Sequence, residues 1–164
     1  MKTSDGILII TTTFSALMAG LFYAYSCSVS LGLGKLSDTD YIKAMQSINR
    51  EIQNPVFFSC FFGLLILLPL TVYLNYESSL TFKFKLLITA TFCYYLGVFF
   101  VTVFGNVSLN DTLENFDAVH QTKQAIKMQR ALFENRWNTF NNIRTVFSII
   151  TVVLLIIVCV GGEK

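Results

Sequence analysis

The stretch TVFSIITVVLLIIVCVGG, residues 145–162, contains no charged side chain. A helix needs about 20 mostly apolar residues to cross a hydrocarbon core about 30 Å thick, so this run predicts a membrane-spanning helix. Three further uncharged stretches, at residues 6–34, 52–76 and 86–110, meet the same criterion. We therefore expect membrane spans at about residues 6–31, 55–76, 84–110 and 137–161.

The connections between these spans predict how they pack. The second connection, residues 77–85, is short, and a short connection joins antiparallel neighbours. Both long connections then lie at the same end. We expect an all-α, membrane-embedded four-helix bundle that runs up, down, up and down as one domain, residues 1–164.

The first connection contains a helix signal. Residues 37–40, Ser-Asp-Thr-Asp, are typical of a helix N-terminus. Apolar side chains follow at helical spacing, at Tyr41, Met45, Ile48 and Ile52. The pattern predicts an amphipathic helix that lies across the mouth of the bundle and ends before Pro55.

The third connection also predicts a helix. Asp111 is followed three residues later by Glu114, which resembles a capping box. We expect the polar helix that it opens to run towards Arg136 and to extend the bundle out of the membrane.

Lysines favour one orientation of the bundle. Lys2, Lys83, Lys85 and Lys164 lie on the side of the short connection. Under the positive-inside rule this favours an integral protein of the bacterial inner membrane with both termini in the cytoplasm.

Composition excludes several classes of function. The chain is 54% hydrophobic and 13% charged, with a net charge of +2 and no basic stripe, so nucleic acid is not an expected partner. His120 is the only histidine, and the four cysteines fall singly, one in each span, at Cys27, Cys60, Cys93 and Cys159. Bis-histidine haem and two-histidine iron sites each need two histidines, so we expect no metal and no other resident cofactor.

Polar side chains gather at the long-connection end of all four spans. Since these segments reach the same end of the bundle, their side chains can converge on one cavity. The candidate residues are Phe22, Tyr23, Tyr25, Gln46, Asn49, Arg50, Gln53, Asn54, Phe57, Asn106, Asn110, Asp111, Trp137, Asn138, Asn141 and Arg144.

Helical spacing sharpens this prediction. Trp137, Asn141 and Arg144 share one helical face, and Asn106 and Asn110 share another. Arg144 lies about 10 Å below Trp137 at 1.5 Å per residue, and an ionisable group at that depth faces the bundle interior or a wet cavity. The alternative is that the arginine snorkels and the asparagines only join helices.

Two tyrosines of the first span add a further candidate. Tyr23 and Tyr25 are two residues apart and point to different helical faces, so at most one of them is expected to face the cavity, and the other is expected to anchor the helix at the membrane interface.

Four motifs in this order resemble the anthrone oxygenase-like family of small four-helix membrane proteins. They lie at residues 16–26, 44–55, 106–110 and 137–145. The resemblance implies oxidation of an anthrone by O₂ to an anthraquinone, without an evident cofactor. The family motif usually reads Asn-Val-Pro-Leu-Asn, and Ser108 here replaces the proline, which restores a backbone N–H.

The resemblance implies roles for the candidate residues. Arg144, Asn106, Asn110 and Asn141 would stabilise a substrate oxyanion, a tyrosine such as Tyr23 or Asp111 would act as base, and the aromatic residues Phe22, Phe57 and Trp137 would stack on the substrate. The expected partners are the lipid bilayer and a small apolar aromatic substrate or lipid-like ligand. Homo-oligomerisation stays open.

Two other readings remain at this stage. In the first, the chain is a non-catalytic subunit that binds a lipid or quinone in the same cavity. In the second, it is a scaffold whose asparagines join its helices.

Overall fold

The computed structural model describes residues 2–76 and 81–161, and within them every regular element is helical. Four of the helical runs are long and apolar enough to cross a membrane, which confirms the predicted fold class of an all-α membrane bundle. Residues 77–80 of the short connection, and Lys164, which contributed to the predicted orientation, lie outside the described residues.

The four runs coincide with the four expected spans. The first, third and fourth begin before their expected starts, whereas the second begins as expected at Pro55 and ends two residues early, at Leu74. The first comprises α1 (Thr3–Ala24), the π-helical η1 (Tyr25–Val29) and α2 (Ser30–Leu33), and the second is α4 (Pro55–Leu74). The third comprises α5 (Phe82–Tyr94), η2 (Tyr95–Phe99), η3 (Thr102–Val107) and α6 (Ser108–Glu114), and the fourth is α7 (Lys123–Val160).

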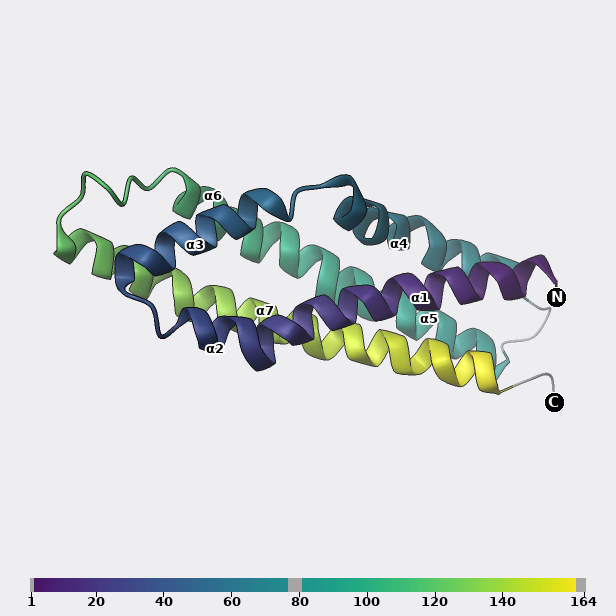
Figure 1. Cartoon of the computed structure of the whole chain (residues 1–164). Helices are drawn as coiled ribbons and strands as arrows, with labels where there is room; N and C mark the ends of the chain where they lie inside the picture. The colour runs from purple at the N-terminus through teal and green to yellow at the C-terminus, as the bar shows by residue number, and fades with distance from the viewer. Residues whose placement is uncertain (1, 77–80, 162–164) are drawn as a thin grey trace.

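The helices alternate in direction around one axis (Figure 1). α1 packs on α4 and α7, and α5 packs on the same two helices, so each has two neighbours. The start of α1 and the end of α7 lie at one end of the molecule, and α2, α3 and α6 lie at the other. The core between them is apolar, and its fully buried side chains include Leu64, Leu68, Leu87, Ala90, Tyr94 and Leu155.

The outward surface of the spans is also apolar. Large side chains point away from the bundle, as expected for a surface that faces lipid. They include Leu17, Ile66, Phe92, Phe104 and Val153.

The fourth run is a single helix of 38 residues. At 1.5 Å per residue it is about 57 Å long, almost twice the thickness of a hydrocarbon core. Its first turns therefore project beyond the membrane, which confirms a helical extension in the third connection. The predicted capping box is wrong, because α6 already begins at Ser108 and ends at Glu114, so no helix begins at Asp111. Thr122 caps α7 instead, and its Oγ1 accepts from the amide of Ala125 at 3.2 Å.

The amphipathic helix of the first connection is α3 (Asp38–Glu51). Ser37 caps it as expected, since its Oγ accepts from the Asp40 amide at 3.2 Å. Tyr41 and Met45 are buried and form an apolar cluster with Leu113 of α6 and Phe133 of α7. α3 thus packs alongside α6 and α7 and does not cross the mouth of the bundle as expected. Only its C-terminal end reaches the mouth, where Asn49 lines the cavity described below.

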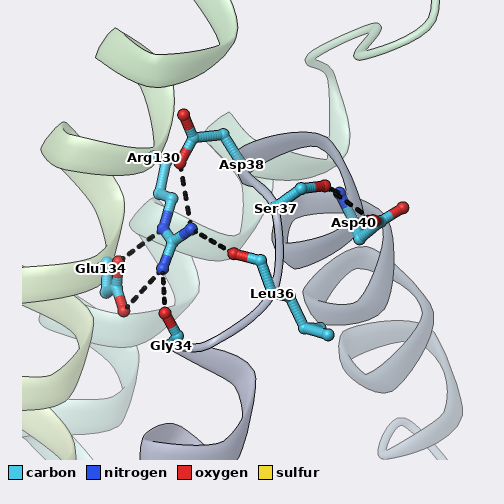
Figure 2. A network of polar contacts seen from close by, with 7 residues as sticks. All are labelled: Gly34, Leu36, Ser37, Asp38, Asp40, Arg130 and Glu134. Carbon is cyan, nitrogen blue, oxygen red and sulfur yellow. Dashed lines mark hydrogen bonds and ion pairs between the residues drawn. The ribbon is translucent and has the colours of Figure 1, made fainter.

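Arg130 of α7 joins this cap to the bundle (Figure 2). Its guanidinium donates to Glu134 at 2.7 Å, to Asp38 at 3.0 Å, and to the carbonyls of Gly34 and Leu36 at 2.8 and 2.9 Å. Gly34 caps the C-terminus of α2 and Leu36 lies in the turn that follows, so neither carbonyl accepts a helical hydrogen bond. One side chain thus satisfies both carbonyls and fixes the turn into α3. The guanidinium also lies 4.5 Å from the ring centre of Tyr41. Burial raises the pKa of the Tyr41 phenol above its usual range, so this phenol stays neutral.

The π-helical turns were not expected. They widen the helix locally, and two of them place a glycine against a ring of α7. A Cβ at Gly97 would overlap the ring of Phe147, and a Cβ at Gly105 would lie 2.9 Å from the ring of Phe140. The rings occupy the space that these glycines leave, so the backbones of the third run and α7 approach closely.

Candidate functional site

A cavity of about 220 Å³ lies at the long-connection end of the bundle, between the end of α1, the start of α4, η3 and α7. Its wall is polar on the α7 side and largely aromatic on the α4 side. It is lined by Leu21, Phe22, Tyr25, Asn49, Ile52, Gln53, Phe57, Phe58, Phe61, Phe62, Thr102, Val103, Asn106, Val107, Asn110, Asp111, Trp137, Asn141 and Arg144. The predicted convergence of the four polar segments is therefore a feature of the structure.

Arg144 forms the polar inner part of this wall and is only 6% exposed. Its Nη2 donates to Oδ1 of Asn141 at 3.0 Å and its Nη1 to the hydroxyl of Thr102 at 3.4 Å. The guanidinium lies 4.5 Å from the ring centre of Phe22 and 5.5 Å from that of Trp137. Across residues 2–76 and 81–161, no carboxylate lies within ion-pairing distance of it. This buried cation therefore lacks the anionic partner that usually offsets its desolvation.

Asn141 orients the guanidinium and joins α7 to α1. Its Nδ2 donates to the carbonyl of Phe22 at 3.1 Å and to Oγ of Ser26 at 3.0 Å. The carbonyl of Phe22 and the hydroxyl of Ser26 fix the orientation of the amide, because its nitrogen must face these acceptors and its oxygen then faces Arg144. Asn141 thus acts as helix glue and also positions a cavity group.

The third run contributes two asparagines that hold Trp137. The indole Nε1 donates to Oδ1 of Asn110 at 2.9 Å, and Nδ2 of Asn106 donates to the carbonyl of Trp137 at 3.4 Å. Because the carbonyl can only accept, this contact fixes the Asn106 oxygen on the opposite side of its amide. The indole also packs against Tyr25, with ring centres 5.2 Å apart.

Three polar atoms of cavity residues are buried without a hydrogen-bond partner in the described structure. They are Nε of Arg144, Oδ1 of Asn106 and Nδ2 of Asn49, and the only other such atom is Oγ of Ser15. Buried polar groups are normally paired, since an unpaired one costs about 1–3 kcal/mol. A bound ligand with both acceptor and donor groups, or ordered water, would supply the missing partners.

Five predicted residues lie elsewhere. Tyr23 is 54% exposed on the outside of α1, so Tyr25 is the tyrosine of this pair that faces the cavity. Asn138 is half-buried on α7 and does not line the cavity. The others have structural contacts: Gln46 donates to the carbonyls of Leu113 and Phe116, Arg50 pairs with Glu114, and Asn54 caps α4 by accepting from the amides of Val56 and Phe57.

Several lining residues were not predicted. Thr102 precedes Asn106 by four residues and contacts Arg144, so the helical spacing that grouped Asn106 with Asn110 was the signal that would have found it. The apolar lining residues gave no comparable signal, because they do not differ in type from residues that face lipid. They are Leu21, Ile52, Phe58, Phe61, Phe62, Val103 and Val107.

The titratable groups on the cavity wall are Tyr25, Asp111 and Arg144. Asp111 is exposed at the outer end, whereas Tyr25 is half-buried.

His120 lies outside the cavity, with Nδ1 at 2.6 Å from Oδ2 of Asp117, and this hydrogen bond lowers the pKa of the Asp117 carboxyl. In the part of the chain that the structure describes, no three His, Cys, Asp or Glu side chains gather where they would hold a metal ion.

Comparison with known family profiles shows the family of this chain. A family profile described as anthrone oxygenase matches residues 57–154, more than half of the chain. This region contains the aromatic start of α4, the two asparagines of the third run and the polar face of α7. No curated protein and no solved structure shows a significant match.

Proposed function

Because the chain belongs to the anthrone oxygenase family, we propose that it is a membrane-embedded oxygenase that oxidises an apolar, phenolic, anthrone-like substrate with O₂. The observation that carries the proposal is the buried guanidinium of Arg144, which has no carboxylate partner in the described residues and lies in a cavity lined by aromatic rings. Such a site favours an apolar ring system with an acidic oxygen.

The chemistry is balanced without a further reductant. An anthrone, C₁₄H₁₀O, and O₂ give anthraquinone, C₁₄H₈O₂, and water. Loss of a methylene proton gives an aromatic enolate, which transfers an electron to O₂. Recombination forms a C–O bond to a peroxide, and loss of water leaves the second carbonyl. Since the substrate carbanion supplies the electrons, the proposal includes no resident redox cofactor.

The cavity residues would act on the charge of the enolate. Arg144 offers its unpaired Nε–H to the oxyanion, and Asn141 holds the guanidinium in place. Donors that are already oriented in a site of low polarity stabilise a developing anion without reorganisation. Phe22 and Trp137 flank the guanidinium, so a flat substrate bound to it would lie against their rings. Asp111 and Tyr25 are the groups on the wall that could take the methylene proton.

A direct assay tests this proposal. Purified protein in phosphatidylcholine vesicles is given anthrone, and O₂ uptake and anthraquinone formation are followed against empty vesicles, because anthrones also oxidise without a catalyst. We expect anthraquinone formation that saturates with substrate and is lost in Arg144→Leu. Arg136→Leu, which changes an exposed arginine two helical turns away, is the matched control. Turnover equal to that of empty vesicles would contradict an oxygenase.

Binding without turnover would favour the alternative of a non-catalytic ligand-binding subunit. Elemental analysis and an absorption spectrum of the same preparation test the cofactor-free part of the proposal. A stoichiometric metal, haem or flavin that is required for turnover would contradict that part alone.

A further inference from the structure

The outer end of the cavity is held by polar contacts. Nε2 of Gln46 donates to the carbonyls of Leu113 and Phe116 at 2.8 and 2.9 Å, and Nη1 of Arg50 lies 2.7 Å from Oε1 of Glu114. These contacts join the last turns of α3 to the end of α6. A ligand that entered between α3 and α6 would have to separate two elements joined by hydrogen bonds and by a buried apolar cluster. The exposed part of the outer end is lined by Gln53 and Asp111, whose polar side chains disfavour the passage of an apolar ligand.

The inner end of the cavity is also closed. The hydroxyl of Tyr94 donates to the carbonyl of Phe61 at 2.8 Å and joins α5 to α4. The ring of Phe99 in η2 lies 5.7 Å from that of Phe61 and 6.5 Å from that of Phe62, measured between ring centres. This aromatic contact closes the seam between α4 and the third run below the cavity.

Between these two closures, the seam has no polar contacts. In the described residues, no hydrogen bond or ion pair joins the first turns of α4, residues 55–60, to η3. Four side chains that line the cavity are also open to the outside at this seam: Phe58 is 36%, Phe62 47%, Val103 38% and Val107 42% exposed. They belong to helices that are long and apolar enough to cross a membrane, so lipid is the surroundings that we expect outside them.

We propose that the cavity opens sideways into the bilayer through this seam, and that its ligand enters from the lipid as a neutral, membrane-dissolved aromatic acid. We call Phe58, Phe62, Val103 and Val107 the portal. Passage needs only side-chain rotations and breaks no hydrogen bond, and stacked rings at the portal offer faces to a flat molecule. The inference rests on one part of the proposed function, namely that the cavity binds an apolar aromatic ligand.

The portal explains how an apolar acid reaches a buried cation. A neutral phenol or anthrone partitions into lipid and is therefore more concentrated there than in water. Its flat ring system aligns with the acyl chains. Beyond the portal it meets Arg144, which stabilises the deprotonated form. The bilayer thus supplies the neutral acid, and the cavity retains the anion.

The single tryptophan makes access measurable. Trp137 is the only tryptophan and lines the cavity, so its emission reports occupancy directly. We would place the protein in dioleoylphosphatidylcholine vesicles, mix them rapidly with identical vesicles loaded with 2-naphthol, and follow quenching of Trp137. The reverse mixing with empty vesicles gives the release rate.

Two variants change the portal in opposite directions. Phe58→Ala removes a ring, and we expect association and release to become several-fold faster. Val103→Phe/Val107→Phe adds two rings, and we expect both rates to fall about tenfold relative to wild type, as for a narrowed gate. Val146→Phe makes the same type of change at a 55% exposed position on α7, away from the cavity, and should leave both rates unchanged.

The outcomes separate the two proposals. If wild-type protein is quenched but both portal variants exchange at the wild-type rate, or if Val146→Phe slows exchange as much as the portal variant does, the portal is wrong and the proposed function stands. If 2-naphthol never quenches wild-type Trp137, the cavity does not bind aromatic acids, and both proposals fail. A rate that rises in Phe58→Ala and falls in Val103→Phe/Val107→Phe supports the portal.

Discussion

The hydroxyl of Tyr95 donates a hydrogen bond to the main-chain carbonyl of Leu65. Leu65 lies four residues before Pro69, and proline has no N–H to complete the helical bond to that carbonyl. In a membrane no water replaces the missing donor, so a side chain of the neighbouring helix must do so. A proline in α4 is therefore tolerated because Tyr95, the first residue of η2, supplies the missing donor.

This hydrogen bond predicts how much the hydroxyl oxygen of Tyr95 contributes to stability. Tyr95→Phe leaves the Leu65 carbonyl unpaired, and we expect a loss of about 1 kcal/mol in the free energy of unfolding. Unfolding by dodecyl sulfate in mixed micelles measures it. Tyr73→Phe removes a hydroxyl from a tyrosine that is 76% exposed and should change stability little. Equal stability of Tyr95→Phe and Tyr73→Phe would show that the carbonyl does not depend on Tyr95.

Close packing at the π-helical turns predicts a second effect. In Gly97→Ala the new methyl group would overlap the ring of Phe147, so the variant should lose about 1–3 kcal/mol of unfolding free energy. Gly20→Ala places a methyl in open space on the same bundle and should gain up to about 1 kcal/mol through helix propensity. The same unfolding assay compares them, and a stable Gly97→Ala would mean that Phe147 moves aside freely.

The contacts of Arg130 predict that its loss would loosen the turn into α3 and leave the bundle itself unchanged. Arg130→Ala leaves the carbonyls of Gly34 and Leu36 unpaired, so the turn into α3 should open more readily by about 2 kcal/mol. Hydrogen exchange of amides 34–41 should accelerate, while exchange in α4 and α5 stays as in wild type. Arg136→Ala, at an exposed position on the same helix, is the control. Unchanged exchange in Arg130→Ala would show that the apolar cluster alone holds α3.

Much of the fold follows from the sequence because it depends on local properties. Uncharged runs and helical spacing predict the spans, and Ser37 predicts the start of α3. The pattern of Asp111 and Glu114 gave a wrong prediction because a capping box and the last turns of a polar helix contain the same residue types. Only the start of α6 at Ser108, before Asp111, distinguishes the two. The π-helical turns could not be predicted from local sequence, because they accompany tertiary contacts such as that between Gly105 and the ring of Phe140.

The cavity was only partly predictable for a related reason. Trp137, Asn141 and Arg144 share a face through their spacing, and that face lines the cavity. Asn54 has the same side chain as Asn106 but caps a helix, and composition does not distinguish a cap from a cavity amide. The α4 side of the wall consists of phenylalanines whose role depends on which way the helix is rotated.

Arg144 carries the final prediction, which separates ligand binding from stability. Leucine at this position loses the donors to Asn141 and Thr102 but also relieves the desolvation of an unpaired cation, so we expect stability within about 1 kcal/mol of wild type. Affinity for 2-naphthol, measured by quenching of Trp137, should fall about a hundredfold in Arg144→Leu and about tenfold in Arg144→Lys, since lysine keeps the charge but not the planar fork of donors. Arg136→Leu should bind as wild type does. If Arg144→Leu instead binds the probe with wild-type affinity and unfolds more readily, the guanidinium serves the packing of α7 against α1 and η3, and the anion would have to be held by Asn49 and the other amides of the wall.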